Sequence, residues 1–174
     1  MGKITFVLGG ARSGKSNFAK RLAEEQKNGR VVFLATSQAL DQEMARRIKK
    51  HKQSRPAHWL TLEEPLDLSA ALRKQKNRFT FIIIDCLTLW VSNMILAGYS
   101  ERSVILAAGK ALDVLKKNKA QAVIVANEVG LGIVPNNKLA RDFRDIAGKV
   151  NQLVARHAQE VYFIIAGITT KIKG

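Results

Sequence analysis

Short runs of consecutive apolar residues alternate along the chain with longer stretches in which apolar positions recur every three or four residues. The runs indicate strands, and the helical spacing of the longer stretches indicates helices. The predicted strands lie at residues 4–8, 31–35, 59–62, 79–85, 121–127 and 161–166. The predicted helices lie at residues 15–26, 41–52, 65–73, 87–96, 101–117 and 138–157. Pro65 is expected at the first position of the third of these helices. Because the strand runs are continuous rather than alternating, both faces of the sheet should be covered. The pattern therefore predicts a three-layer α/β fold with a mostly parallel sheet.

Composition narrows the class of protein. Apolar residues make up 47% of the 174 positions, which excludes a disordered chain. No apolar run approaches the roughly 20 residues that a membrane helix needs, and the first residues do not resemble a secretory signal. Cys86 is the only cysteine, so no internal disulfide can form. We expect a single domain over residues 1–174, in the cytoplasm.

Charge points to an anionic partner. Lysine and arginine total 29 against 14 acidic residues, a formal net charge of +15, which attracts polyanions or phosphorylated small molecules. Six cations with no acid among them lie between Met44 and His58: Arg46, Arg47, Lys49, Lys50, Lys52 and Arg55. They form either a phosphate-handling surface or a solvated helix face. Aromatic residues are only 6% of the chain, and no RNA-binding motif stands out, so nucleic acid is not the expected partner.

The turn after the first predicted strand matches the phosphate-loop pattern G-x-x-x-x-G-K-[ST], and it has the required strand before it and helix after it. Glycines let backbone N–H groups approach phosphates, and the helix N-terminus adds a favourable dipole. The lysine can follow the β- and γ-phosphates as a compact cation. The nucleotide-binding loop is predicted to be Gly9, Gly10, Ala11, Arg12, Ser13, Gly14, Lys15 and Ser16. The fold is then of the P-loop NTPase-like (RecA-like) type, with Lys15 acting in catalysis.

A phosphate loop usually works with an acidic residue at the end of another strand. Asp85 follows four consecutive apolar residues and fits that position. With the Ser16 hydroxyl it is expected to bind Mg²⁺. The alternative is that Asp85 caps the next helix, and the two roles can coexist.

Further segments carry a resemblance to a known family. They include Ala35-Thr36-Ser37-Gln38, Arg47-Ile48 with His51, Arg55 to Trp59, Asn127 to Pro135 and Arg141 to Asp145. With the phosphate loop, this set resembles the bifunctional adenosylcobinamide kinase/adenosylcobinamide-phosphate guanylyltransferase family of cobalamin biosynthesis. The resemblance implies phosphorylation of adenosylcobinamide by ATP or GTP. It then implies transfer of GMP from GTP to adenosylcobinamide phosphate, giving adenosylcobinamide-GDP and pyrophosphate.

The resemblance also implies roles for residues. His51 matches the nucleophile that carries GMP as a phosphoramidate, and its cationic neighbours should favour the neutral imidazole and stabilise the departing pyrophosphate. Nucleotide contacts are implied for Ala35, Thr36, Ser37, Lys52, Gln53, Ser54, Arg55, Glu63 and Asp85. A carboxylate at Glu63 can accept from guanine N1–H and N2–H, although Glu63 can also be a charge at a helix start beside Pro65. The role of residues 127–135 stays open between a corrinoid-facing and a subunit-facing surface. The family's homotrimer is carried over.

Other interpretations of the same residues remain open at this stage. His51 can be a polar position on a basic helix. The chain can be a P-loop kinase for another small hydroxylated metabolite, which has no use for a histidine nucleophile. It can also be a basic NTPase that binds nucleic acid, in which case affinity should fall steeply with salt.

Overall fold

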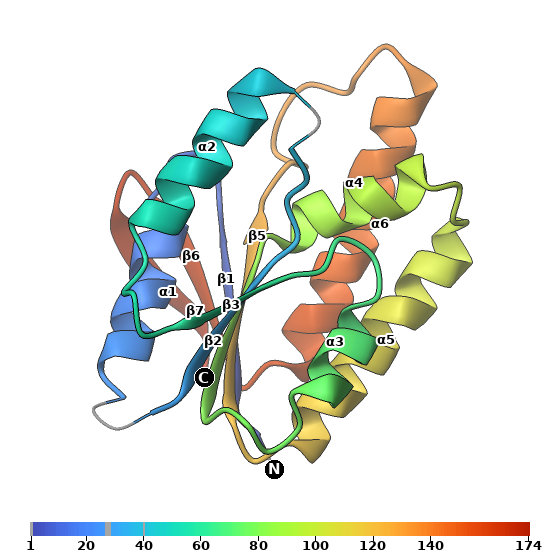
Figure 1. Cartoon of the computed structure of the whole chain (residues 1–174). Coiled ribbons are helices and arrows are strands. Elements are labelled where there is room, and N and C mark those ends of the chain that lie inside the picture. Colours follow the sequence, from blue (N-terminus) through green and yellow to red (C-terminus); the bar gives the residue numbers. More distant parts are fainter. Residues whose placement is uncertain (1, 27–28, 40) are drawn as a thin grey trace.

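A seven-stranded sheet runs through the middle of the computed structural model, with strand order β3-β2-β4-β5-β1-β6-β7 (Figure 1). The structure describes residues 2–26, 29–39 and 41–174. Neighbouring strands are parallel, except that β7 pairs antiparallel with β6. The strands are β1 (Ile4–Gly9), β2 (Val31–Ala35), β3 (Leu60–Glu63), β4 (Phe81–Asp85), β5 (Gln121–Asn127), β6 (Glu160–Ile165) and β7 (Ile168–Lys173).

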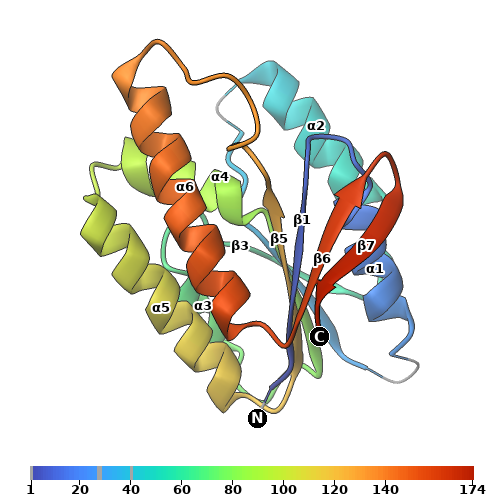
Figure 2. The same cartoon turned by 180° about the vertical axis from the view of Figure 1, so that it is seen from behind.

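Helices cover both faces of this sheet, as the continuous apolar strands predict. Figures 1 and 2 show α1 and α2 on one side and the other four labelled helices on the opposite side. The helices are α1 (Lys15–Glu24), α2 (Gln42–Gln53), α3 (Leu68–Lys74), α4 (Leu87–Leu96), α5 (Glu101–Lys117) and α6 (Lys138–His157). The three-layer α/β prediction is therefore confirmed.

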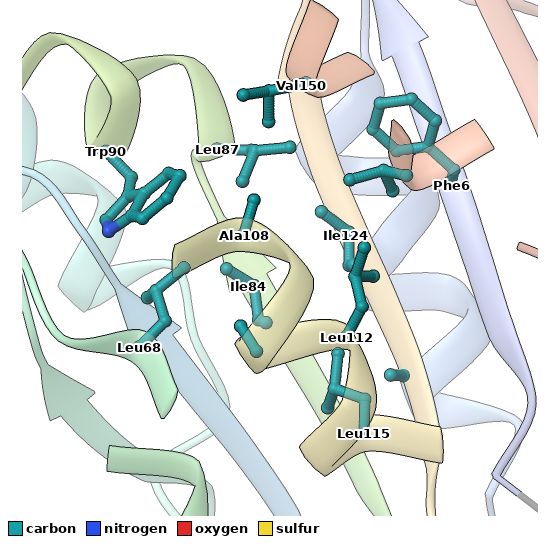
Figure 3. Close-up of a cluster of buried hydrophobic side chains, with 14 of the residues drawn as sticks. Phe6, Leu68, Ile84, Leu87, Trp90, Ala108, Leu112, Leu115, Ile124 and Val150 are labelled. Atoms are coloured by element: carbon teal, nitrogen blue, oxygen red, sulfur yellow. The ribbon is translucent and has the colours of Figure 1, made fainter. Parts of the chain in front are cut away.

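Successive residues of each central strand enter two separate cores. Phe6 and Leu8 pack with α3 to α6, whereas Val7 between them packs with α1. Figure 3 shows the larger core, in which Trp90 of α4 is fully buried. The indole N–H of Trp90 donates to the Leu66 carbonyl at 2.7 Å. This packing fixes α4, and so it fixes the chain that leaves the carboxyl end of β4.

The α2 helix differs from the others because none of its residues is buried. Asp41 begins it by accepting a hydrogen bond from the Met44 N–H at 2.7 Å, which is an N-cap. Its cations therefore lie in solvent rather than in a core, as expected for either interpretation of the basic cluster.

One expectation for the elements was wrong, and one strand was not predicted. Pro65 does not begin a helix: α3 begins at Leu68, and Asp67 caps it by accepting from the Ala70 N–H at 2.9 Å. The side-chain cap sets the start, and Pro65 lies in the connection, where its carbonyl accepts from Asn93. Strand β7 was not predicted, because its residues are mostly exposed and show no buried run. Elsewhere the strand and helix bounds agree to within two residues.

Candidate active site

Five strand ends meet at one edge of the sheet and define the candidate site. Gly9 pairs with Asn127, and Ala35 pairs with both Glu63 and Asp85 in the strand registers. All five residues end their strands. In an open parallel sheet this carboxyl edge is where ligands bind. The sequence-predicted phosphate loop, acid and carboxylate are therefore brought to one edge.

The phosphate loop has the backbone that its glycines predict. Gly9 has a φ of 153°, and a Cβ there would lie 2.3 Å from the Ile164 carbonyl oxygen. Gly14, just before α1, has a φ of 102°, which favours glycine. The loop is also held from outside, because the Gly167 N–H at the β6–β7 turn donates to the Ser13 carbonyl at 2.9 Å.

Lys15 projects into this loop from the first residue of α1. Its side chain is buried, and Nζ lies 2.5 Å from the Gly10 carbonyl oxygen and 3.4 Å from Ser13 Oγ. Burial lowers the pKa of Lys15, while the nearby Cys86 and Asp85 act in the opposite direction. A partly desolvated ammonium held against the backbone of this loop is suited to bind an oligophosphate.

Ser16 and Asp85 form the contact that a metal-binding pair requires. The Ser16 hydroxyl donates to Asp85 Oδ2 at 2.8 Å, joining α1 to the end of β4. Burial raises the pKa of Asp85, and the Ser16 hydrogen bond and the charges of His51, Arg55 and Lys15 oppose that rise. The N-cap residue of α4 is Cys86 and not Asp85. The capping alternative for Asp85 is therefore not what the structure has.

The basic segment around His51 is hydrogen-bonded to α1 through Ser54 and Lys20. His51 is exposed on the last turn of α2. The Arg55 guanidinium carbon lies 3.7 Å from the centre of the Phe33 ring, a cation–π contact. Burial lowers the pKa of Arg55, and its Nε is buried with no hydrogen-bond partner among the described residues. The structure thus brings the histidine segment and the phosphate loop to one site.

Of the other residues around His51, Lys52 and Ser54 contact neighbouring elements. Lys52 forms an ion pair with Glu63 at the end of β3. Ser54 accepts from Lys20 Nζ of α1 at 2.7 Å through its hydroxyl and at 3.2 Å through its carbonyl. Gln53 is exposed. Because α3 begins only at Leu68, the alternative of Glu63 as a helix-start charge does not hold.

Thr36 contributes to the frame of the site. Its hydroxyl donates to the Cys86 carbonyl at 2.7 Å and accepts from the Cys86 N–H at 3.0 Å. Its carbonyl accepts from Asn93 Nδ2 at 2.7 Å. Ala35 beside it is buried, whereas Ser37 is half-buried and Gln38 exposed. Thr36 and Asn93 lock the end of β2 to the segment that carries Asp85.

Lys20 is a site residue that sequence reasoning missed. It contacts Ser54, and burial lowers its pKa, as does the charge of Arg55, while Asp85 and Glu24 oppose this. The spacing indicates that Lys20 lies near Ser16, because residues four apart share one face of a helix. Nothing in the sequence showed that Ser54 and Arg55 would fold back onto that face.

The two remaining histidines have other surroundings. His58 is exposed, with its ring 6.5 Å from that of Trp59. His157 Nδ1 lies 2.9 Å from the Leu153 carbonyl oxygen in the last turn of α6. Across residues 2–26, 29–39 and 41–174, no group of three or more His, Cys, Asp or Glu side chains is placed to hold a metal ion. Within the same ranges no helix is both long and apolar enough to cross a membrane.

Solved structures with low sequence identity share the fold. The flagellar accessory protein FlaH from Methanocaldococcus jannaschii superposes with a TM-score of 0.56 at 15% identity, over 98% of this chain and 78% of that one. The KaiC-like protein PH0186 from Pyrococcus horikoshii gives a TM-score of 0.54 at 13% identity, over 92% and 70% of the two chains. These matches confirm the predicted P-loop NTPase-like fold.

Sequence relatives are much closer. A protein of Pseudomonas aeruginosa named bifunctional adenosylcobalamin biosynthesis protein CobP is 44% identical over 168 residues, covering 97% of this chain and 96% of the relative. The CobU proteins of the same description from Escherichia coli and Salmonella typhimurium are 40% and 42% identical, covering 98% of this chain and 99% of each relative. Residues 5–172 match the family described as cobinamide kinase / cobinamide phosphate guanyltransferase. The chain belongs to the cobinamide kinase / cobinamide phosphate guanyltransferase family.

Proposed function

We propose that this protein phosphorylates adenosylcobinamide with ATP or GTP and then transfers GMP from GTP to the product, releasing pyrophosphate. The observation that carries the proposal is that the phosphate loop and the histidine-bearing basic segment meet at α1. Ser16 of the loop contacts Asp85, and Lys20, four residues further along α1, donates to Ser54 of the segment that carries His51. A kinase for another metabolite has no need of the histidine-bearing segment.

In the kinase step, the loop binds the triphosphate and Lys15 neutralises its β- and γ-phosphates. The aminopropanol hydroxyl of the corrinoid attacks the γ-phosphorus and releases its proton, the bond to the bridging oxygen breaks, and the nucleoside diphosphate leaves. Such transfer depends on positioning and charge stabilisation more than on covalent chemistry by the protein. The fixed loop and the buried ammonium of Lys15 supply both.

The Ser16–Asp85 pair fits Mg²⁺, because a hydroxyl and a carboxylate 2.8 Å apart are hard oxygen ligands beside the phosphate loop. Mg²⁺ bound there would neutralise charge on the phosphate oxygens. Mg²⁺ in such sites is usually held by one or two protein oxygens together with substrate phosphates and water.

In the guanylyl step, we propose that the neutral imidazole of His51 attacks the α-phosphorus of GTP. The bond to the bridging oxygen breaks, and pyrophosphate leaves with its charge stabilised by the surrounding cations. The phosphate of adenosylcobinamide phosphate then attacks the same phosphorus, the P–N bond breaks, and the imidazole is restored. The exposure of His51 supports this role, since both phosphates need access to the ring.

Glu63 is the proposed guanine-recognition residue. It ends β3 at the carboxyl edge, in register with Ala35 of β2, and its partner Lys52 directly follows His51. Guanine N1–H and N2–H are two adjacent donors that a carboxylate accepts, whereas adenine offers no such pair. The remaining proposed nucleotide contacts are Ala35, Thr36, Ser37, Gln53, Ser54 and Arg55, together with the loop from Gly9 to Ser16.

Two further proposals concern the assembly of the protein and its location in the cell. A homotrimer agrees with the apolar hairpin at the sheet edge, where Ile165, Ile168 and Ile172 are all more than half exposed; native mass spectrometry measures it. A cytoplasmic location agrees with Cys86 being a free, buried thiol. The basic surface is assigned to phosphorylated substrates and not to nucleic acid.

A stepwise product assay tests the function. The protein is incubated with adenosylcobinamide and ATP, and GTP is added afterwards, with the corrinoids separated by chromatography. We expect adenosylcobinamide phosphate before the addition and adenosylcobinamide-GDP after it. If the corrinoid is unchanged while ATP is consumed with another hydroxylated metabolite, the proposed function is wrong.

A further inference from the structure

An exposed apolar surface lies on the connection between β5 and α6, residues 128–137. Leu131, Ile133 and Val134 are 81%, 96% and 60% exposed, the largest such grouping within one loop of the described chain. We name these three residues the apolar crest. A group of solvent-exposed apolar side chains is typical of a surface that binds a ligand or another protein.

The crest is held in place by its own loop. The Gly130 N–H donates to the Glu128 carboxylate at 2.5 Å. Arg141 donates to the Pro135 carbonyl at 3.0 Å, and Arg144 donates to the Gly132 carbonyl at 3.2 Å. One of these bonds lies within the loop, and the other two join the loop to α6. The exposure of the crest is therefore built into the fold.

The first residues of the loop are hydrogen-bonded to the phosphate site. The Glu128 N–H donates to the Gly9 carbonyl at 3.0 Å, and the Asn127 N–H donates to Thr88 Oγ1 at 2.7 Å. Figure 2 shows the connection running from the end of β5 to the N-terminal end of α6. The crest is thus joined through a single short segment to the loop that binds the triphosphate.

The far end of the loop borders a hollow between α4 and α6. It has a volume of about 330 Å³ and is lined by Ile95, Leu96, Leu139 and Phe143, with the polar Ser92 and Asn137 at its side. Leu96 and Leu139 are themselves 63% and 55% exposed. The hollow is too small to enclose a macrocycle, and it suits the edge of one.

Charge separates this surface from the rest of the protein. Residues 129–137 carry no charged side chain, although the chain has a formal net charge of +15. The basic segment around His51 suits phosphates, whereas an uncharged apolar surface suits a ligand that carries no negative charge. Unphosphorylated cobinamide is such a ligand: its macrocycle has an apolar, methyl-bearing edge, neutral amide side chains and a cobalt centre that is not anionic.

We propose that the apolar crest and the hollow beside it bind the corrin ring of cobinamide, with the aminopropanol arm directed to the phosphate loop. This inference rests on the proposed function and deepens it by assigning the acceptor site. The apolar edge of the ring covers Leu131, Ile133 and Val134, and its amides meet the polar groups at the side of the hollow. The proposed nucleotide contacts Lys52 and Gln53 lie on α2, which Figure 1 shows on the other face of the sheet from α6, so donor and acceptor approach the phosphate loop from different directions.

Equilibrium titration of the folded protein with cobinamide, followed by corrin absorbance without nucleotide, tests the inference. Leu131→Ser and Ile133→Ser remove apolar surface that is already in solvent, so both variants should fold. We expect each to weaken cobinamide binding about tenfold and to raise the KM for cobinamide, with the KM for ATP unchanged. Leu106→Ser is the matched control, since Leu106 is 56% exposed on α5, and it should bind as the wild type does.

Each outcome is decisive. Unchanged cobinamide affinity in both crest variants overturns the assignment, and dissociation of an oligomer with unchanged affinity overturns it in favour of a second copy of this chain on the crest. If the wild type neither binds nor phosphorylates cobinamide, the proposed function fails as well. If the wild type does both and only the variants bind weakly, the assignment stands.

Discussion

Replacing Asp85 with asparagine separates the functional role of this acid from its structural role. The change removes one negative charge and keeps the shape of the side chain. Ser16 Oγ donates to Asp85 Oδ2 at 2.8 Å, and an asparagine carbonyl oxygen can accept the same bond. The variant should therefore fold with the same connection between α1 and β4, while lacking the carboxylate that is proposed to hold Mg²⁺.

The expected loss of activity follows from what a charged contact contributes. A hydrogen bond or ligand contact to a charged group is worth about 1.5–3 kcal/mol, and about 1.4 kcal/mol corresponds to a factor of ten. The kinase rate of Asp85→Asn at limiting Mg²⁺ should thus fall about 10- to 100-fold. Saturating Mg²⁺ should restore part of it.

The stability of the nucleotide-free protein should change in the opposite sense. Burial raises the pKa of Asp85, so the folded state binds the proton more tightly than the unfolded chain does. Between the ordinary pKa of aspartate, about 3.9, and the raised folded pKa, stability falls as pH rises. Wherever the buried carboxyl is ionised, its desolvation costs free energy that the neutral asparagine does not incur. The thermal midpoint of the variant should be equal to or above that of the wild type.

The assay is a Mg²⁺ titration of the kinase rate, paired with thermal unfolding without nucleotide. Asp67→Asn is the matched control, because Asp67 caps α3 by accepting from the Ala70 N–H and asparagine caps as well. An unchanged Mg²⁺ titration and rate in Asp85→Asn would refute the assignment. So would a large fall in the thermal midpoint, since it would make Asp85 a structural residue.

Three further substitutions test separate parts of the account. Lys15→Ala removes the buried cation of the phosphate loop, so nucleotide affinity measured by calorimetry should fall at least about tenfold, whereas exposed Lys76→Ala should leave it unchanged. Glu63→Gln replaces a carboxylate, which can accept from both guanine donors, with an amide that has one acceptor oxygen and one donor NH₂ group. The ratio of GTP affinity to ATP affinity, measured by competition binding, should therefore fall about tenfold. An unchanged ratio would remove Glu63 from guanine recognition. Hydrogen bonds from Lys171 and Lys3 lower the pKa of Glu160. The ionised carboxylate therefore stabilises the folded protein fully above the ordinary glutamate pKa of about 4.3, and this contribution is lost as pH falls through the lowered folded pKa. Glu160→Gln should consequently reduce the thermal midpoint at neutral pH and make little difference in strong acid, and an equal reduction at both would contradict the ion-pair explanation.

The phosphate loop and Asp85 could be predicted from the sequence because each depends on residues that are close together along the chain. The phosphate loop needs glycines at fixed offsets and a lysine at the start of a helix, and Gly9, Gly14 and Lys15 satisfy this within eight residues. Asp85 was found because a continuous apolar run ends at it. The alternation of runs and helical spacing likewise determined the three layers.

Contacts between distant parts of the chain could not be read in this way. The Thr36 hydroxyl is occupied by Cys86, fifty residues away, and Lys20 meets Ser54 across thirty-four residues. Strand β7 is recognisable only from its pairing with β6, since its side chains have no buried run. Pro65 matched a helix-start rule, but the side-chain cap at Asp67 determined where α3 begins.

The central claim is that His51 carries GMP at the same site where the phosphate loop binds a triphosphate. Intact-mass and peptide mass spectrometry after incubation with GTP and Mg²⁺, under alkaline conditions that preserve a P–N bond, tests this most directly. The account predicts one GMP adduct on His51, present in His58→Ala and absent in His51→Ala, with His51→Ala still phosphorylating adenosylcobinamide. A normal adduct in His51→Ala, or its loss in His58→Ala instead, would contradict the claim.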